Sequence, residues 1–377
     1  GLVNKNNIQA IFKKYIDNFN YINNKENNES YKWEIIKKFQ EFDIDAENFA
    51  EMLNQFCKVT GNLVDSSQQL PFYALVAYAR KEPETVREMF KKLYANEYID
   101  DIEKQKLIDE FIESSEQLRR KYYPESRLYV NNQRSVMMYL FLRYPNSNYG
   151  YKASQAKNFA DCIEFYEDWG PMTNFKLSTF NRMCNQLVEE IKLNKDLIDT
   201  HKSRYEDTSR IFHLDEEFHI LAMDIIFSSQ TYNFYDGMVF SPINAQSRKI
   251  YFENVKKAQE VASAFKKAKA DMNILTEAKK YVEINLTKGS AVKHKKFGKG
   301  VIEECSGNTV SISFPEINDT KKLNLVVSVS NGIMVLFDEK VTDRVKEYAT
   351  IMGKETAITT AFIKAESTLQ SYIEYLD

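Results

Sequence analysis

The sequence of 377 residues has few of the residues that build common catalytic and cofactor centres. It contains four cysteines, four histidines, eleven glycines and seven prolines. The cysteines, Cys57, Cys162, Cys184 and Cys305, are far apart and form no CxxC pair, which is typical of reduced thiols in a cytoplasmic protein. The sequence has no Gly-x-x-x-x-Gly-Lys-Ser/Thr loop, dinucleotide fingerprint or nucleophile motif. We therefore expect no cofactor and no enzymatic activity of the chain by itself.

Long apolar runs are also absent. No segment is long and apolar enough to span a bilayer, and there is no signal peptide, so we expect a cytoplasmic protein without a membrane partner. The net charge of −3 argues against bulk phosphate binding by the whole molecule. Charged residues make up 28% of the sequence, and carboxylate pairs are therefore abundant. A metal-dependent nuclease centre built from such a pair stays open as an alternative.

Two histidines and one aspartate come close enough in sequence to suggest a metal site. His213, Asp215 and His219 lie within seven residues, and Asp215 and His219 are expected to share a helix face. Zinc proteases place their two histidines one turn apart, whereas His213 and His219 are six residues apart and would point to different faces. The spacing therefore favours a polar helix start over a metal site, and we expect no bound metal.

Apolar residues at three- and four-residue spacing predict an α-helical domain over residues 1–240. We expect Asp45 to cap the helix that carries Phe49 and Phe56, and Pro83 to lie in the first turn of another helix. Helices are expected over residues 5–23, from near Tyr31 onward, and over 132–144, 153–168, about 175–194 and about 214–228.

The pattern changes after Pro242. Residues 244–285 predict one long helix without glycine or proline, and residues 339–377 predict a second, interrupted only by Gly353. Both carry apolar residues at heptad spacing, so we expect them to form an antiparallel hairpin. The segment between them, 288–337, shows the two-residue period of short strands. The fold class expected is mostly α, with a small β-barrel inserted between the two hairpin helices.

The strand-rich segment contains a recognisable motif. Its residues are Val292, His294, Phe297, Gly298, Gly300 and Val301, followed by a strand ending in Phe314 and a closing strand with Lys322, Leu323 and Leu325. This motif resembles the Tudor- or SH3-like barrel at the C-terminus of UvrD/PcrA-type helicases. The resemblance covers about forty residues, 288–325, and implies a module that binds protein or nucleic-acid partners.

The helical domain carries a second set of motifs over residues 31–235. They are Tyr31-Lys32-Trp33, Pro83-Glu84-Thr85-Val86-Arg87-Glu88-Met89-Phe90, Gln133-Arg134-Ser135-Val136, Leu142-Arg143-Tyr144-Pro145 and Tyr149-Gly150-Tyr151-Lys152. Their order and spacing are similar to the helical region N-terminal to the AAA+ motor of McrB-like restriction ATPases. The motor motifs are absent from this sequence, so nucleotide hydrolysis is not implied. Arg143 could bind an anion or close a helix end by pairing with a carboxylate.

The two resemblances together imply an adaptor or accessory subunit of bacterial DNA-metabolism or anti-phage restriction machinery. Its partner would be a protein such as a separate ATPase, helicase or nuclease subunit. We expect the turn from His294 to Gly300 to be the recognition edge, with Phe297 serving the barrel core rather than a partner. The candidate binding residues are Lys293, His294, Lys295, Lys296, Phe297 and Lys299.

A second interpretation is direct binding of DNA or RNA. Residues 248–299 contain fourteen lysine or arginine residues against five acidic ones, an excess of nine. A basic segment of this kind can contact phosphates, although an exposed helix has the same composition. The candidate nucleic-acid contacts are Lys256, Lys257, Lys266, Lys267 and Lys269, together with the barrel lysines.

Overall fold

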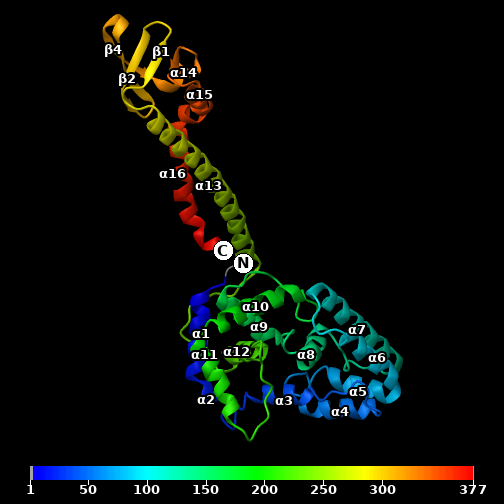
Figure 1. Ribbon diagram of the computed structural model, residues 1–377. Coiled ribbons are helices and arrows are strands. Elements are labelled where there is room, and N and C mark those ends of the chain that lie inside the picture. The colour runs from blue at the N-terminus through cyan, green and yellow to red at the C-terminus, as the bar shows by residue number, and fades with distance from the viewer. Residues whose placement is uncertain (1–2, 377) are drawn as a thin grey trace. The chain divides into compact units, whose positions relative to one another are not determined.

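The computed structural model describes residues 3–376 and shows a mostly helical protein with a small antiparallel sheet in its C-terminal part (Figure 1). The chain divides into two compact units, Gly1–Arg248 and Lys249–Asp377, and each is described by itself. None of the helices described has the length and apolar character needed to cross a membrane.

Unit 1 is built from helices packed around one large apolar core. Its α-helices are α1 (Lys5–Asp17), α2 (Phe19–Ile22), α3 (Tyr31–Phe39), α4 (Phe49–Val59), α5 (Pro71–Lys81), α6 (Pro83–Leu93), α7 (Asp101–Tyr122), α8 (Gln133–Arg143), α9 (Ala153–Ile163), α10 (Leu177–Lys192), α11 (Lys195–Lys202) and α12 (His219–Thr231). A short 3-10 helix, η1 (Ser203–Glu206), follows α11.

Local capping interactions explain several boundaries and correct two expectations. The helix that carries Phe49 is capped by Asn48, whose side chain accepts a hydrogen bond from the Glu51 N–H, and not by Asp45. Asn48 is the residue directly before the first helical position, where an amide oxygen reaches the free N–H groups. The segment 5–23 is also two helices, because Asn18 ends α1 and its side chain donates to the Lys14 carbonyl.

The core of unit 1 contains a buried network of charged residues. The Lys32 ammonium lies 2.9 Å from an Asp224 carboxylate oxygen and also pairs with Glu29, and all three side chains are less than a tenth exposed. Tyr15 donates its hydroxyl to Asp224 and accepts a hydrogen bond of 3.0 Å from Arg204. Helices from the two ends of unit 1 are thus joined through paired charges, as buried ions require.

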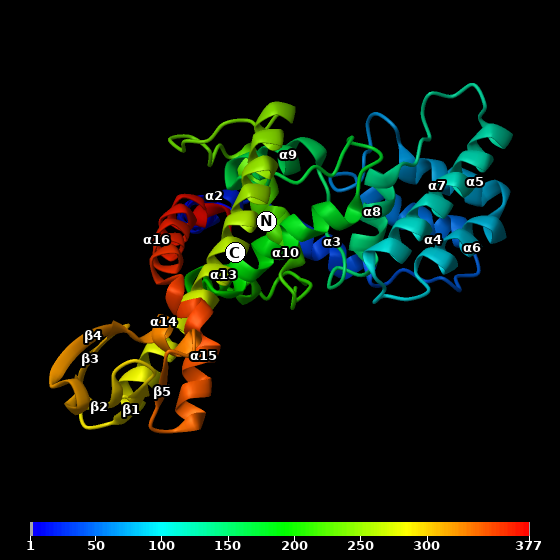
Figure 2. The same cartoon turned by 90° about the horizontal axis from the view of Figure 1, so that it is seen from above.

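Unit 2 contains a five-stranded antiparallel sheet whose strands lie in the order β4-β3-β2-β1-β5 (Figure 2). Its elements are α13 (Ala245–Asn285, which begins in unit 1), β1 (Ala291–His294), β2 (Gly298–Ser306), β3 (Thr309–Phe314), η2 (Pro315–Ile317), β4 (Asp319–Asn324), α14 (Leu325–Ser330), β5 (Met334–Leu336), α15 (Glu339–Gly353), α16 (Glu355–Tyr372) and η3 (Ile373–Tyr375). Leu325, expected in the closing strand, begins α14 instead, where Asn324 caps the helix by accepting the Val327 N–H.

Helix α13 contacts α15, α16 and η3 in antiparallel order. The rings of Tyr281 and Tyr348 are 5.9 Å apart between centroids. Farther along the helices, the rings of Phe265 and Phe362 are 5.8 Å apart. The segment expected as one helix over 339–377 is divided into α15 and α16 at Lys354, directly after Gly353. Glycine has a low helix propensity, which explains the position of this break.

Candidate partner-binding surface

The turn between β1 and β2 is organised by His294. This residue is buried, and its Nδ1 atom accepts hydrogen bonds from the backbone N–H groups of Lys296, at 3.0 Å, and Phe297, at 3.2 Å. Burial, together with the positive charge of Lys296, lowers the pKa of His294. A neutral imidazole is the form that can accept these hydrogen bonds. His294 therefore holds the turn in place and is not itself available to a partner.

Two glycines of β2 permit this turn to pack on the sheet. Gly298 has a φ of +75°, and a Cβ atom there would lie 1.7 Å from a carboxylate oxygen of Glu316. At Gly300 a Cβ atom would lie 2.7 Å from side-chain atoms of Ile312 and of Phe314. The first glycine supplies a left-handed backbone conformation, and the second supplies space for the core of the sheet.

The outer side of β1, β2 and β5 carries an apolar groove with a volume of about 510 Å³. Val301, Val335 and Phe337 are between two-fifths and one-half exposed there. Exposed apolar side chains that gather in one groove are typical of interaction sites rather than of an ordinary protein surface. The lining residues are Ala291, Val292, Lys293, Lys299, Gly300, Val301, Pro315, Val335, Leu336 and Phe337.

Two lysines on neighbouring strands lie side by side in the lining of this groove. Lys293 on β1 is the register partner of Lys299 on β2 and also of Val335 on β5. Both lysines are exposed, and neither forms an ion pair with an acidic residue in the part of the chain that the structure describes. Like charges placed directly opposite each other on a sheet are unfavourable. The groove therefore combines an apolar floor with uncompensated positive charge.

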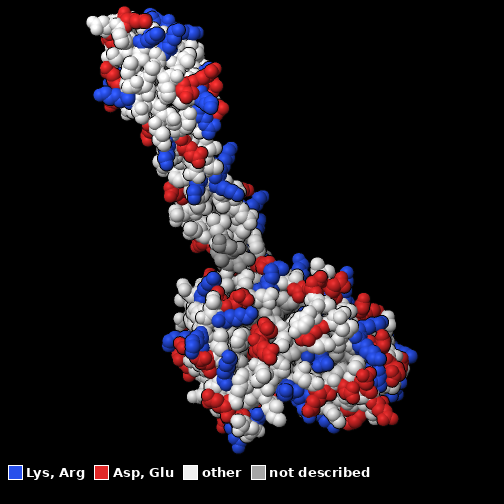
Figure 3. All heavy atoms as spheres, in the orientation of Figure 1, with Lys and Arg blue, Asp and Glu red and all other residues white. Residues whose placement is uncertain are grey.

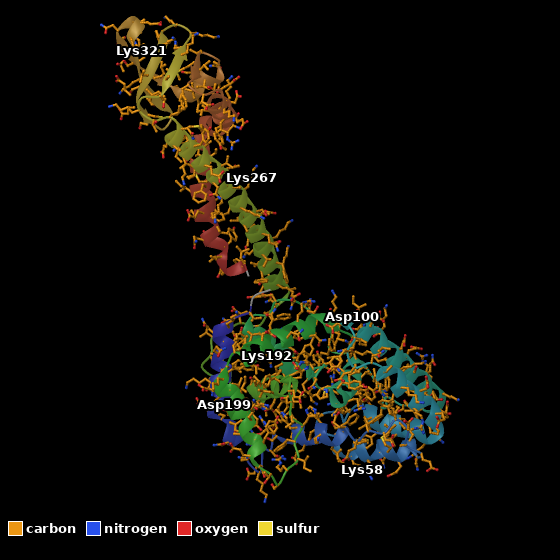
Figure 4. The ribbon with its side chains drawn as sticks, in the orientation of Figure 1. Lys58, Asp100, Lys192, Asp199, Lys267 and Lys321 are labelled. Carbon is orange, nitrogen blue, oxygen red and sulfur yellow. The ribbon has the colours of Figure 1, made fainter. Side chains whose placement is uncertain are left out.

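The remaining residues of the predicted recognition edge lie on the turn and do not line the groove. Lys295 and Lys296 are exposed. Phe297 is half-buried against His294 and Phe314, with ring centroids 4.4 and 5.3 Å away. The ammonium of Lys321 on β4 lies 5.4 Å from the centre of the Phe297 ring (Figure 4). The turn therefore brings Phe297 to the edge of the sheet core, with part of its ring still open to solvent.

Sequence reasoning identified Lys293 and Lys299 but missed Val335 and Phe337. Val335 lies in β5, which has only three residues, too few to show a convincing alternation, and Phe337 directly follows that strand. The signal that could have found them is the apolar run from Ile333 to Phe337 directly before the acidic start of α15.

Apart from the barrel lysines, the lysines proposed for nucleic-acid contact all lie on α13 and are exposed. They do not form a continuous basic stripe. Glu253 and Glu260 lie three and four residues from Lys256 and therefore share its face of the helix. On the visible face of this segment, basic and acidic side chains are interspersed (Figure 3). Lys267 lies about three turns from Lys256, and no acidic residue of residues 3–376 pairs with either.

The group His213, Asp215 and His219 does not form a metal site. No cluster of three or more histidine, cysteine or acidic side chains with metal-binding geometry occurs among residues 3–376. Asp215 was expected to share a helix face with His219, but it precedes α12, with a φ of +53°. Its carboxylate accepts hydrogen bonds from the N–H groups of Ile220 and Leu221 at the start of that helix. Asp215 therefore caps a helix, a role that its position four residues before α12 conceals in the sequence.

Arg143 does not form the carboxylate pairing that its motif suggested as one alternative. Its guanidinium donates a hydrogen bond of 3.4 Å to the side-chain oxygen of Gln40 and lies over the Tyr144 ring. No carboxylate pairs with it in the part of the chain that is described. It closes the end of α8 through neutral partners.

Comparison with protein-family models, with curated proteins and with solved structures finds no match to this chain. The two family resemblances remain hypotheses drawn from sequence motifs.

Proposed function

We propose that this chain is a non-catalytic adaptor that recognises a protein partner through the groove on β1, β2 and β5. The observation that carries the proposal is the pair of neighbouring lysines, Lys293 and Lys299, beside exposed Val301, Val335 and Phe337. Such a groove favours an extended protein segment with apolar side chains for the floor and acidic side chains for the two lysines.

The strand order supports the SH3- or Tudor-like assignment of this sheet. The last strand, β5, returns to pair with the first, β1, so the chain order of the strands is not the order in the sheet. This arrangement, together with the bulge between Ile302 and Glu304 that bends β2, is what a very small barrel needs. We propose that this barrel is inserted between α13 and α15 as the binding module of the chain.

The helical unit then suggests the kind of machinery that the adaptor serves. Its motifs resemble a region attached to restriction ATPases, and the barrel motif resembles a helicase appendage. An ATPase, helicase or nuclease subunit of DNA-metabolism or anti-phage restriction machinery is the partner that both resemblances support.

Direct binding of DNA or RNA is the second candidate. The observation that favours it is the exposure of five α13 lysines, none of which pairs with an acidic residue among residues 3–376: Lys256, Lys257, Lys266, Lys267 and Lys269. The acidic residues that share the face of Lys256 weaken it, because phosphate contact requires a continuous positive surface.

A peptide-display selection on the full chain tests the adaptor proposal. Enriched peptides should combine acidic and apolar residues. Replacing Lys293 and Lys299 with glutamate should weaken an enriched peptide by about tenfold or more, because two charge-assisted contacts are lost. Ile363→Asp and Lys364→Glu on α16 change equally exposed residues outside the groove and should leave affinity unchanged. Peptides that bind the Lys293/Lys299 variant as tightly as the parent would contradict the proposal.

Fluorescence anisotropy with duplex DNA and single-stranded RNA tests the second candidate function, direct binding of nucleic acid. Direct binding should be measurable at about 50 mM salt and should weaken with a slope of about −0.9 per phosphate contact on logarithmic axes for duplex DNA. It should also be reduced when Lys256, Lys266 and Lys267 are replaced with glutamate. The adaptor interpretation expects no change in anisotropy at this salt concentration.

A further inference from the structure

A second concave site lies in unit 1. It is a cavity of about 210 Å³ at the N-terminal ends of α8 and α9, closed by the loop that follows α4. The residues meeting there come from four parts of the chain. The lining residues are Leu63, Val64, Asp65, Gln69, Pro71, Val130, Asn132, Arg134, Ser135, Met138, Tyr151, Lys152, Ala153, Ser154, Gln155 and Met172.

Two cations line this cavity without a carboxylate bound to either. The guanidinium of Arg134, in the first turn of α8, forms no hydrogen bond or ion pair within residues 3–376. Lys152 donates one hydrogen bond of 3.1 Å, to the backbone carbonyl of Leu63. Both residues are half-buried. A partly desolvated arginine or lysine is normally paired, so two unpaired cations in one cavity require an explanation.

The electrostatics of Lys152 show that the two charges interact. Burial, with the positive charges of Arg134 and Lys32, lowers the pKa of Lys152 to about 8. Each cation therefore makes the other less favourable in this cavity, and an anion placed between them would relieve the repulsion.

The start of α9 adds further donors. Lys152 is the N-cap residue of this 11-residue helix, and no side chain caps the helix. Ala153, Ser154 and Gln155, the first three residues of the helix, all line the cavity. Their N–H groups have no partner within the helix, and the helix dipole favours negative charge at this end. The start of α8 differs, because Asn132 and Ser135 form a capping box there.

One acidic residue also lines the cavity. Asp65 is occupied by its own loop, since its carboxylate oxygens accept the backbone N–H groups of Ser67, Gln68 and Gln69 at 3.0, 2.9 and 2.6 Å. It forms no ion pair with Arg134 or Lys152, but its negative charge offsets part of theirs: it opposes the lowering of the Lys152 pKa, and, against the effect of burial, these backbone hydrogen bonds and Arg134 in turn lower the pKa of Asp65. The lining thus holds two cations against one hydrogen-bonded carboxylate, a net charge of +1.

From this arrangement we propose that the cavity binds a small oxyanion of the phosphate class, either free or as the terminal group of a small phosphate ester. Arg134 would contact it with its planar guanidinium, Lys152 with its ammonium, and α9 with its free N–H groups. A cavity of about 150 Å³ holds benzene, and drug-sized ligands need about 300 Å³ or more. The observed volume therefore suits a phosphate with a small substituent.

Isothermal titration of the full chain with inorganic phosphate, at ionic strength matched with sodium chloride, tests this proposal. We expect saturable binding that Arg134→Gln and Lys152→Met each weaken by about tenfold or more, because each removes one charged donor. Arg120→Gln and Lys195→Met change exposed residues of the same unit and should leave binding unchanged. Phenyl phosphate should bind as well as inorganic phosphate if a small ester fits.

Three further measurements separate loss of binding from loss of folding and locate the bound phosphate. Circular dichroism checks that each variant is folded, and Arg134→Lys, which keeps the charge but loses the planar fork, should retain part of the affinity. Phosphate should also shift the amide resonances of Ala153 and Ser154. The absence of saturable binding by the parent protein, or equal binding by the Arg134 and Lys152 variants, would overturn the proposal. Neither result would bear on the groove of unit 2.

Discussion

The imidazole of His294 lies against the phenyl ring of Phe297, with ring centroids 4.4 Å apart and an angle of 19° between the ring planes. The same imidazole accepts the Phe297 N–H. Ring stacking and a backbone hydrogen bond thus fix one turn through two neighbouring positions. A small sheet with few large side chains depends strongly on such a local arrangement.

This relationship predicts coupled effects of substitution. Phe297→Ala should lower the stability of the sheet by about 1–2 kcal/mol, less than the 3–5 kcal/mol typical of a fully buried phenylalanine, because part of the ring is open to solvent. His294→Ala should also destabilise the sheet, and the double variant should lose less than the sum. Hydrogen exchange of peptides covering residues 291–314 measures these changes. Strictly additive losses would show that the two rings act independently.

Gly300→Ala should be far more harmful to unit 2 than substitution of Gly353, the other glycine described in this unit that lacks a positive φ. The added Cβ atom would lie 2.7 Å from Ile312 and Phe314, so the sheet must open or shift to accept it. We expect a loss of about 1–3 kcal/mol, typical of overpacking in a core. Increased hydrogen exchange in β2 and β3 is the measurement, and unchanged exchange would contradict the close packing described here.

The matched substitution, Gly353→Ala, should increase the stability of unit 2 instead of lowering it. A Cβ atom at Gly353 meets nothing within 4 Å, and the residue ends α15 without a positive φ. Alanine should therefore stabilise α15 and α16 by about 0.5–1 kcal/mol through helix propensity and a less flexible unfolded chain. Slower hydrogen exchange across residues 345–362 would support this expectation, and faster exchange would show that the break at Lys354 is required.

The buried charge network of unit 1 provides a third stability prediction. Lys32→Met should destabilise unit 1 by about 3–5 kcal/mol, because Glu29 and Asp224 would remain buried without their cation. Lys38→Met removes an exposed lysine from the same helix and should change stability by about 0.5 kcal/mol or less. Urea unfolding followed by tryptophan fluorescence reports on this unit, since Trp33 and Trp169 both belong to it. Equal midpoints for the two variants would contradict the role assigned to Lys32.

Periodicity predicted the helical content and the strand-rich segment, because helical spacing and alternation are local properties. Periodicity could not predict contacts between residues that are far apart in the sequence. Lys32 and Asp224 are separated by 192 positions, and no local signal shows that they meet in the core. The floor of the groove combines Lys293 with Val335 through the pairing of the first and last strands, which only the sheet topology reveals.

The sequence could not predict, for the same reason, that Arg134 and Lys152 lie unpaired in one cavity of unit 1. The motifs that contain Arg134 and Lys152 were visible, but their meeting at one cavity depends on how α8, α9 and the loop after α4 pack. The sequence suggested an anion contact for Arg143, whereas the structure gives Arg143 a neutral partner and leaves Arg134 without one. The residue types could indicate an anion contact, but only the packing of the helices shows which arginine lines the cavity.

The last prediction concerns the titration of Lys152. Its pKa should be about 8, because burial and the charges of Arg134 and Lys32 oppose protonation. An unfolded lysine titrates near 10.4, so the unfolded state holds more protons between about pH 8 and 10.4, and the free energy of unfolding should rise with pH across that window. Arg134→Gln should raise the pKa of Lys152, and bound phosphate should raise it as well, since each change favours the charged ammonium. Carbon-13 NMR of the labelled lysine Cε, assigned with Lys152→Met, measures the pKa directly. A value near 10.4 that responds to neither change would show that the two cations do not share one cavity.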